Sequence, residues 1–351
     1  MFDRKFHHCD LSKFRFLITG GAGFIGSNIV AYLVRHAAGH IRILDDLSNG
    51  YYENIEEFTD LPNVEFIKGD IRDLETCREA VRGMDFVSHQ AALGSVPRSI
   101  GDPLTSNAVN ITGFLNMLVA SKEASTLKRF VYAASSSTYG DLHELPKVEG
   151  KEGKPISPYA VTKAVNEMYA EVFSRVYGFH SIGLRYFNVF GPKQNPGNPY
   201  AAVIPIFCRH FIDGTSPTIY GDGQTSRDFT FVVNAVQANI KGLLYGLESE
   251  NGHNGLSLTK HEVFNVACGD QISLNELVQV LCEISGKNIQ AVYGPERQGD
   301  VKHSKADIGK IKKILGYNYN YRFKEGLTVT YHQYEKEILV LAIGDKQLKS
   351  S

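Results

Sequence analysis

The sequence predicts an α/β protein built on a doubly wound parallel sheet, with a smaller C-terminal α/β lobe. Short apolar runs typical of buried strands alternate with segments of helical apolar spacing up to about residue 190. The first strand leads directly into a glycine-rich turn and then a helix. Because ligands of such sheets bind at the carboxyl ends of the strands, the residues that follow each strand are candidate functional residues.

The elements can be placed in order from the apolar spacing. Strands are expected at 14–19, 41–44, 64–67, 86–92 with its outgoing loop, 130–134 and 181–184, and helices at 27–36, 74–82, 107–123 and 159–177. Prolines and glycines crowd the stretch from Pro192 to Pro205. We therefore expect a first domain of residues 1–190 and a lobe of residues 191–351, with a segment of about 226–268 returning to the first domain.

Composition argues against several functional classes. The 351 residues carry a net charge of −1 and are 43% hydrophobic, which fits a sizeable core and gives no basic surface for nucleic acid or an anionic membrane. The five cysteines show no metal-binding spacing, so we expect reduced thiols, no metal site and a cytoplasmic location. No apolar run is long enough to span a bilayer, and residues 1–13 lack the apolar core of a signal peptide.

The glycine-rich turn reads Gly20-Gly21-Ala22-Gly23-Phe24-Ile25-Gly26. Gly20 permits the tight turn, Gly23 lets backbone approach a pyrophosphate, and Gly26 lets helix and strand pack closely. The pyrophosphate would bind the free N–H groups at the helix N-terminus. The next strand ends in Asp45, where a carboxylate can hydrogen-bond a ribose diol and would repel a 2′-phosphate. The acid favours NAD over NADP; the alternative is a glycine loop and turn acids with no ligand.

Tyr159 and Lys163 are four residues apart in the predicted helix 159–177, so they share one face of it. The preceding Ser157-Pro158 is typical of a helix start. A buried ammonium beside a phenol would lower the pKa of Tyr159 from about 10 and give a general base usable near neutral pH. The alternative is an amphipathic helix with a solvated lysine.

Other polar residues also follow strands. Ser135-Ser136-Ser137, after the strand 130–134, and the loop after Ala92 are placed for a substrate. Asp70 could reach an adenine ring or could cap the next helix. We expect His89 to be packed in the sheet at its strand end rather than to act as a base.

Two of the arginines in the C-terminal half are candidates for substrate binding, Arg227 beside a predicted strand and Arg297 in the loop 295–300. Two guanidinium groups in the smaller lobe could clamp a diphosphate by bidentate hydrogen bonds. The alternative is two surface ion pairs.

Several motifs in a fixed order give the chain a resemblance to a known family. They are the glycine turn 19–26, the serines before Tyr139-Gly140, Tyr159-x-x-x-Lys163, and Leu184-Arg185-Tyr186-Phe187-Asn188. Over about residues 14–334 the chain resembles an extended short-chain dehydrogenase/reductase. The stretches 90–99 and 134–141 are similar to those of UDP-hexose 4-epimerases, above all the bacterial UDP-N-acetylglucosamine 4-epimerases of surface-polysaccharide pathways.

The resemblance implies three sets of site residues. Catalysis would depend on Tyr159, Lys163 and Ser135. The residues implied to contact NAD, bound by a Rossmann-type first domain, are Gly20, Gly23, Phe24, Ile25, Asp45, Asn49, Gly50, Asp70, Ile71, Ala91, Tyr159, Lys163 and Tyr186. The residues implied to contact the sugar nucleotide are Gly94, Ser95, Ser136, Ser137, Asn188, Ala202, Val203, Tyr220, Arg227, Arg297, Asp300 and Ser304.

The implied reaction is the reversible 4-epimerisation of UDP-N-acetylglucosamine to UDP-N-acetylgalactosamine, for surface-polysaccharide precursors. Tyr159 would take the proton of the sugar 4-hydroxyl beside Ser135 while C4 gives a hydride to NAD, and Lys163 would hold the nicotinamide ribose. The 4-keto sugar would turn over and take the hydride back on its other face. UDP-glucose or UDP-uronic acids are alternative substrates, and a non-catalytic NAD-binding regulatory protein is the alternative of another class.

Two features bear on this choice within the resemblance. Related dehydratases and decarboxylases place an acid after the Ser/Thr of the strand end, whereas the run 135–138 contains none. Ser304 occupies the position where a bulky tyrosine would exclude an N-acetyl group, so its small side chain favours an N-acetylhexosamine. The resemblance also implies a homodimer in which the helices 107–123 and 159–177 form a four-helix bundle with their copies.

The chain departs from the family's pattern at two places. Asn234 replaces the aspartate that is usual in the stretch 229–234, and we expect this change to affect local packing more than catalysis. Residues 338–351 extend past the likeness.

Overall fold

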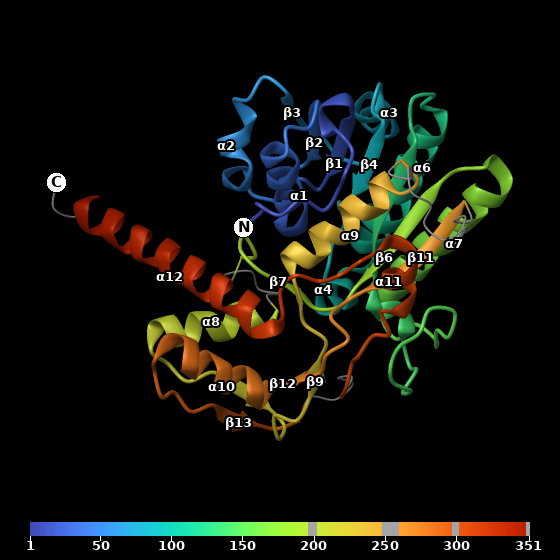
Figure 1. Ribbon diagram of the computed structural model, residues 1–351. Coiled ribbons are helices and arrows are strands. Elements are labelled where there is room, and N and C mark those ends of the chain that lie inside the picture. Colours follow the sequence, from blue (N-terminus) through green and yellow to red (C-terminus); the bar gives the residue numbers. More distant parts are fainter. Residues whose placement is uncertain (196–201, 248–259, 297–301, 349–351) are drawn as a thin grey trace.

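A seven-stranded sheet forms the centre of the molecule (Figure 1). The computed structural model describes residues 1–195, 202–247, 260–296 and 302–348, of which 339–348 are described as backbone only. All neighbouring strands are parallel, in the order β11-β6-β5-β4-β1-β2-β3. They are β1 (Arg15–Thr19), β2 (His40–Asp45), β3 (Val64–Lys68), β4 (Phe86–His89), β5 (Arg129–Ser135), β6 (Ser181–Tyr186) and β11 (His261–Val266). The predicted fold class is confirmed.

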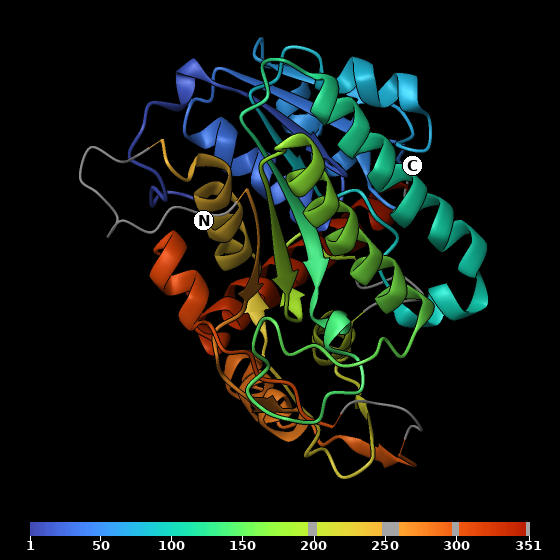
Figure 2. The ribbon, with the colours of Figure 1, turned by 90° about the vertical axis from the view of Figure 1, so that its right-hand side faces the viewer.

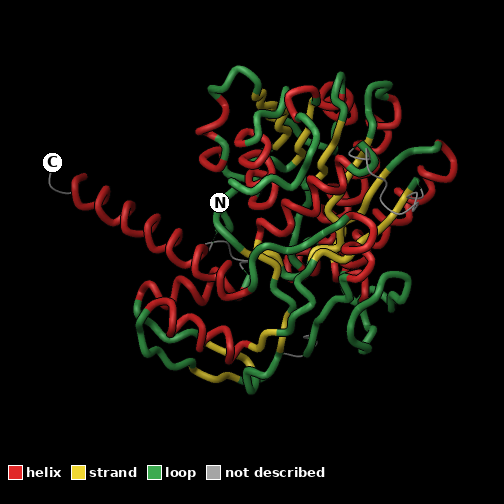
Figure 3. The backbone as a smooth tube through the Cα atoms, viewed as in Figure 1, coloured by secondary structure: helices red, strands yellow, loops and turns green. Residues whose placement is uncertain are grey.

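Helices cover both faces of this sheet (Figure 3). One face is covered by α1 (Phe24–Arg35) and α9 (Val232–Leu244). The other face is covered by α3 (Leu74–Val81), α6 (Phe114–Glu123) and α7 (Pro158–Tyr177). Each layer buries its own apolar cluster against the sheet, which is the arrangement that a doubly wound sheet requires.

The helix predicted at 107–123 is interrupted. It consists of α5 (Pro103–Asn107), a π-helical turn η3 (Ala108–Gly113) and α6. Within the wide turn, Asn110 accepts a hydrogen bond from the Leu93 N–H (2.8 Å) and donates one to the Leu93 carbonyl (3.0 Å). The π turn therefore ties this helix to the loop that follows β4, a contact that apolar spacing does not report.

The order of the strands creates a crevice between β1 and β4. From β1 the chain moves outward to β2 and β3, then returns to place β4 on the other side of β1. Thr19 and His89 are the last paired residues of β1 and β4. Loops leave these two strand ends in opposite directions, and such a reversal point is where open α/β sheets bind their ligands.

The C-terminal lobe lies at the carboxyl edge of the sheet (Figures 1 and 2). Its elements are α8 (Val203–Asp213), β8 (Thr218–Tyr220), β9 (Ser226–Arg227), β12 (Ile272–Ser273), α10 (Leu274–Ser285), β13 (Val292–Gly294) and α12 (Phe323–Leu348). Two short strands, β7 (Val189–Phe190) and β10 (Thr230–Phe231), pair where the chain passes between the lobe and the sheet. The remaining short elements are η1 (Leu11–Lys13), η2 (Tyr52–Asn54), α2 (Glu56–Thr59), α4 (Val96–Gly101), η4 (Ser136–Tyr139) and α11 (Gly309–Leu315).

The C-terminal segment past the family likeness continues α12, whose far half projects from the body of the molecule (Figure 1). The start of this helix is held by Asn234, which is fully buried. Asn234 accepts hydrogen bonds from the N–H groups of Asn320 (2.9 Å) and Tyr321 (3.3 Å) and donates one to the Tyr321 carbonyl (2.8 Å). An ionised aspartate could accept the first two but could not donate the third, so the amide suits this loop.

Candidate active site

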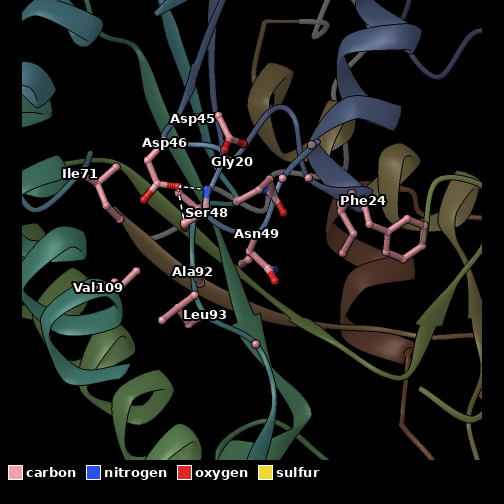
Figure 4. A pocket seen from close by; sticks show the side chains of 18 of the residues that line it. Gly20, Phe24, Asp45, Asp46, Ser48, Asn49, Ile71, Ala92, Leu93 and Val109 are labelled. Atoms are coloured by element: carbon pink, nitrogen blue, oxygen red, sulfur yellow. Dashed lines mark hydrogen bonds between the residues drawn. The ribbon is translucent and has the colours of Figure 1, made fainter. Parts of the chain in front are cut away.

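A pocket opens at the crevice between β1 and β4 (Figure 4). It is lined by strand-end residues and by the segments that follow them. Every residue expected to contact a dinucleotide lines this pocket, namely Gly20, Gly23, Phe24, Ile25, Asp45, Asn49, Gly50, Asp70, Ile71, Ala91, Tyr159, Lys163 and Tyr186. Ser135, Gly94 and Asn188 also line it.

The glycine turn is built for close backbone approach. Gly20 has a φ of +63°, and a Cβ added there would meet the Ala91 N at 2.6 Å. A Cβ on Gly26 would meet the Gly20 carbonyl oxygen at 2.1 Å, so helix and turn can approach only without a side chain. Helix α1 begins at Phe24, three residues before the predicted start, with Gly23 as its N-cap. The N–H groups of its first turn therefore face the pocket, where they can bind a phosphate anion.

Asp45 is the acid at the end of β2. Its Oδ2 accepts a hydrogen bond from the Ala22 N–H (2.9 Å) in the glycine turn, and its Oδ1 accepts one from the Leu47 N–H (2.9 Å). Burial raises the pKa of Asp45, and the two backbone bonds oppose that rise. A carboxylate fixed beside the glycine turn fits the diol of an adenosine ribose, so the donors and acceptors present suit NAD.

The neighbouring acids have separate roles. Asp46 accepts hydrogen bonds from the Ser48 N–H (2.9 Å) and hydroxyl (2.7 Å), the dashed lines in Figure 4, and so shapes the loop after β2. Asp70 accepts a hydrogen bond from the Arg72 guanidinium, which lowers its pKa. The alternative in which Asp70 caps the following helix is wrong, because Asp73 is the N-cap of α3 and accepts from the N–H groups of Glu75 and Thr76.

Tyr159, Lys163 and Ser135 meet at the end of the pocket next to β5. Helix α7 begins as predicted, since the Ser157 hydroxyl accepts a hydrogen bond from the Ala160 N–H (3.1 Å) and Pro158 occupies the first turn. Lys163 is only 3% exposed, so the alternative of a solvated lysine is wrong. Its Nζ donates to the Ala133 carbonyl (2.7 Å).

The expected fall in the pKa of Tyr159 is not found. Burial raises that pKa, and only the hydrogen bond with Ser135 opposes the rise. The reason is geometric: helical spacing puts Tyr159 and Lys163 on one face, but the Lys163 Nζ reaches down to β5 and lies 6.0 Å from the centre of the tyrosine ring. Burial also lowers the pKa of Lys163 to about 8, which weakens its charge as a stabiliser of a phenolate.

Lys163 should impose a pH dependence on stability. Its folded pKa of about 8 lies below the unfolded value of about 10.4, so the unfolded chain binds more protons between these values. Wild-type stability, in protein freed of bound nucleotide, should therefore rise relative to Lys163→Met by roughly 2–3 kcal/mol between pH 8 and about pH 10. Urea unfolding at a series of pH values measures this difference. Parallel curves for the two proteins would contradict the assignment of a shifted Lys163.

His89 is packed in the sheet as predicted. It is buried at the end of β4 between the rings of Phe114 and Phe130, and its Nδ1 bonds the Thr19 hydroxyl (2.8 Å). Burial and the nearby Lys163 lower the pKa of His89 to about 3, so the ring is neutral. The Thr19 hydroxyl in turn accepts from the Ala91 N–H (3.3 Å), so His89 steadies the two strand ends.

Only some of the residues expected to contact a sugar nucleotide line this pocket. Ser95, Ser136, Ser137, Ala202, Val203, Tyr220, Arg227 and Ser304 lie outside the lining of this pocket, and Arg297 and Asp300 lie outside the described residues. Arg227 donates to the carbonyls of Ser226 (2.9 Å) and Lys302 (3.3 Å), and the Ser304 N–H donates to the Ser226 carbonyl (3.1 Å). Backbone hydrogen bonds between Ser226 and the segment 302–304 thus bring Arg227 and Ser304 together.

Backbone strain marks two of the expected substrate residues. Ser95 has a φ of 107° and Asn188 a φ of 38°, in the left-handed region that non-glycine residues avoid. Both follow strands that end at the pocket, β4 and β6. Strained residues of this kind collect at functional sites, where surrounding structure holds them.

Sequence reasoning missed part of the lining. Gln90 directly follows β4, so the strand-end rule could have identified it, whereas Ala133 and Ala134 offered no chemical signal. Val109 reaches the pocket from the π turn, opposite Phe24 in Figure 4. Among the described residues no group of three or more His, Cys, Asp or Glu side chains could hold a metal ion, and none of the described helices has the length and apolar character needed to cross a bilayer.

The chain is similar to known proteins over most of its length. Residues 17–330 match the family model described as GDP-mannose 4,6 dehydratase. The UDP-glucose 4-epimerase of Mycolicibacterium smegmatis is 32% identical over 317 residues, which cover 90% of this chain and 97% of that protein.

Two solved structures are also similar over nearly the whole chain. The UDP-N-acetylglucosamine 4-epimerase of Methanobrevibacter ruminantium, in complex with UDP-N-acetylmuramic acid, has a TM-score of 0.84 and 36% identity, covering 92% of this chain and 99% of that chain. The UDP-glucose 4-epimerase of Thermus thermophilus, in complex with NAD, has a TM-score of 0.78 and 32% identity, covering 91% and 98%. The chain therefore belongs to the GDP-mannose 4,6-dehydratase family, a group of NAD-dependent enzymes within the extended short-chain dehydrogenases/reductases.

Proposed function

We propose that the protein is an NAD-dependent UDP-sugar 4-epimerase whose preferred substrates are UDP-N-acetylglucosamine and UDP-N-acetylgalactosamine. The observation that carries the proposal is the meeting of Ser135, Tyr159 and Lys163 in the pocket that contains the glycine turn. The names of the similar proteins support the same reaction. Epimerisation of UDP-glucose or of UDP-uronic acids is the runner-up.

In the proposed reaction, Tyr159 and Ser135 have separate roles. NAD, when bound, accepts the hydride of C4 and later returns it. Tyr159 takes the proton of the 4-hydroxyl, and Ser135 is hydrogen-bonded beside it to hold that hydroxyl in place. Because the run Ser136-Ser137-Thr138 next to them contains no carboxylate, these residues supply no acid to drive elimination of water from the sugar.

Space near the sugar supports an N-acetylated substrate. A Cβ added to Gly94 would meet no atom within 4 Å, so this loop leaves room beside the pocket. Ser304 is a small residue held close to Arg227 by the backbone contact with Ser226. The similar structure that contains UDP-N-acetylmuramic acid holds an N-acetylated sugar nucleotide.

Proton NMR of the purified protein with UDP-N-acetylglucosamine, and in parallel with UDP-glucose, tests the proposal. Neither reaction receives added cofactor. Growth of the galacto anomeric signal would support 4-epimerisation by a resident NAD. If neither sugar changes in protein that holds NAD, the proposed substrates are wrong and the uronates are tested next.

Ser304→Tyr should reverse the substrate preference. A tyrosine would occupy the space for the acetamide, and a clash in a closed site costs several kcal/mol, so the rate ratio of UDP-N-acetylglucosamine to UDP-glucose should fall by about 100-fold. Ser304→Ala is the matched control, which removes the hydroxyl and keeps the space. If the rate ratio of the two sugars is unchanged in Ser304→Tyr, Ser304 does not determine the substrate preference.

We also propose a homodimer formed through α7 and the helices beside it, the face turned toward the viewer in Figure 2. On α7, Val161, Met168, Val172 and Val176 form an apolar stripe at helical spacing, with exposed fractions between 46% and 65%. A stripe of this kind on one helix is typical of a helix-bundle interface. Met168→Glu with Val172→Glu should convert the dimer to a monomer by light scattering, and a monomeric wild type would contradict the proposal.

A further inference from the structure

Four polar side chains form a hydrogen-bonded group below the pocket, which we name the floor network. Its members are Ser88 of β4, Gln90 after β4, Tyr186 at the end of β6 and Asn239 of α9. Gln90 and Tyr186 line the pocket, while Ser88 and Asn239 are fully buried behind them. Helix α9, which comes from far along the chain, thus contacts the pocket-lining residues Gln90 and Tyr186 through its Asn239.

A backbone carbonyl sets the direction of every bond in the floor network. The Ala235 carbonyl can only accept, so the Asn239 atom 2.8 Å from it is the amide nitrogen Nδ2. Asn239 Oδ1 then accepts from Ser88 Oγ (3.2 Å) and from Gln90 Nε2 (3.1 Å). The Gln90 nitrogen therefore donates to Asn239 Oδ1 and to Ser88 Oγ (3.0 Å). The Gln90 oxygen accepts a hydrogen bond from the Tyr186 hydroxyl (3.0 Å).

The same logic fixes the proton of Tyr186. Asn239 Nδ2 donates its second hydrogen to the Tyr186 oxygen (2.7 Å), so the Tyr186 proton must point to Gln90. Burial raises the pKa of Tyr186 and keeps the phenol neutral. Of the two tyrosines in the pocket, Tyr159 is therefore the one available as a base, and Tyr186 is held as a hydrogen-bonding group.

The floor network presents acceptors to the pocket. The amide hydrogens of Gln90 and Asn239 and the hydroxyl hydrogens of Ser88 and Tyr186 are all directed to partners within the network or to the Ala235 carbonyl. Gln90 and Tyr186 line the pocket, and Gln90 Oε1 and the Tyr186 oxygen each keep capacity to accept a further hydrogen bond. A ligand that matches these acceptors must bring hydrogen-bond donors, and the carboxamide nitrogen of nicotinamide carries two N–H hydrogens.

We propose that Gln90 Oε1 and the Tyr186 oxygen accept hydrogen bonds from the nicotinamide carboxamide, that Asn239 is the positioning residue that orients both side chains, and that these contacts keep NAD bound through each catalytic cycle. The inference rests on the proposed function in that it assigns the nicotinamide to this end of the pocket. It concerns the retention of NAD, which can be measured without any sugar nucleotide. If the proposed sugar substrate is wrong, the proposed retention of NAD by these residues is unaffected.

Gln90→Met tests the proposal because it keeps the length of the side chain and removes the amide. Gln237→Met is the matched control. Gln237 is a residue of α9 that is 2% exposed and does not line the pocket, and its side chain accepts a hydrogen bond from the Asn318 N–H (3.0 Å). Tyr186→Phe, which removes the hydroxyl alone, keeps the test valid if Gln90→Met does not fold. The measurement is the rate at which NAD in the purified holoenzyme exchanges with isotopically labelled NAD.

Loss of one well-placed polar contact predicts about tenfold faster exchange in Gln90→Met and in Tyr186→Phe, with wild-type exchange in Gln237→Met. A second readout is the near-ultraviolet absorbance of bound NADH during turnover, which should rise in Gln90→Met if the nicotinamide is misplaced for hydride return. Wild-type exchange and wild-type absorbance in Gln90→Met would overturn the proposal. So would equal effects in Gln90→Met and Gln237→Met, since those would indicate only a structural role.

Discussion

Tyr159→Phe should lower kcat by about 1000-fold, the range attributed to a positioned general base. The variant keeps the ring that fills the space beside Ser135 and loses only the atom that takes the proton. Because burial raises the pKa of Tyr159, the neutral phenol is the resting form of the folded chain, and deprotonation must accompany turnover. The rate, measured by NMR with a UDP-hexose, should rise with pH in the wild type and show no such rise in the residual activity of the variant.

The control is Tyr169→Phe, which removes a hydroxyl from the same helix α7 at a partly buried position away from the pocket. Tyr169→Phe should leave kcat within a factor of about two, because substitutions away from the site and the buried core have small effects. NAD retained per protomer should be equal in both variants and the wild type. If Tyr159→Phe keeps more than about a tenth of the wild-type rate, another group is the base and the proposed mechanism is wrong.

Arg185→Met should destabilise the protein by about 3–5 kcal/mol, the cost of breaking a buried ion pair by removing one partner. Arg185 is 4% exposed and donates to both carboxylate oxygens of Glu167, at 2.9 and 2.6 Å. It also bonds Glu152, and its guanidinium carbon lies 4.9 Å from the centre of the Tyr139 ring. Without the arginine, the carboxylates of Glu152 and Glu167 would lose this cationic partner.

A second substitution separates the charge effect from the packing effect. Glu167→Gln in the Arg185→Met background should restore part of the loss, because it removes the stranded charge and keeps the shape. Arg175→Met offers a control on the same helix, since the Arg175–Glu171 pair is exposed and should contribute less than about 1 kcal/mol. Chemical denaturation measures all four proteins. A loss below about 1 kcal/mol for Arg185→Met would mean that the buried pair is not structural.

The first turns of helix α7 show how far sequence reasoning extends. Its start was predictable because Ser157 and Pro158 act through bonds to their own neighbours in the chain. The electrostatics of its first turn were not, because the pKa of Tyr159 depends on where the Lys163 Nζ finds a partner. That partner, the Ala133 carbonyl, is 30 residues away and becomes adjacent only when β5 packs beneath the helix.

The acids before α3 show a local signal that the prediction for Asp70 overlooked. Asp73 stands directly before Leu74, the position of an N-cap, and bonds the N–H groups two and three residues on, while Asp70 pairs with Arg72 two residues away. The apolar spacing of 107–123 predicted a regular helix, whereas the structure has a π turn there, which brings Val109 to the pocket and whose Asn110 bonds Leu93 of a separate segment. Bonds between distant segments leave no mark on local periodicity.

By itself the sequence determined the fold class, the glycine turn, the acid after β2 and the helical pairing of Tyr159 with Lys163. Each of these depends on residues that lie within a few positions of one another, or on alternation that persists along the chain. Tertiary structure alone decided the protonation of Tyr159 and Lys163, the contact of Arg227 with the segment that carries Ser304, and the floor network that joins Gln90 to Asn239. The physical reason is that burial and long-range hydrogen bonds act through distance in space, which a linear pattern of residue types does not contain.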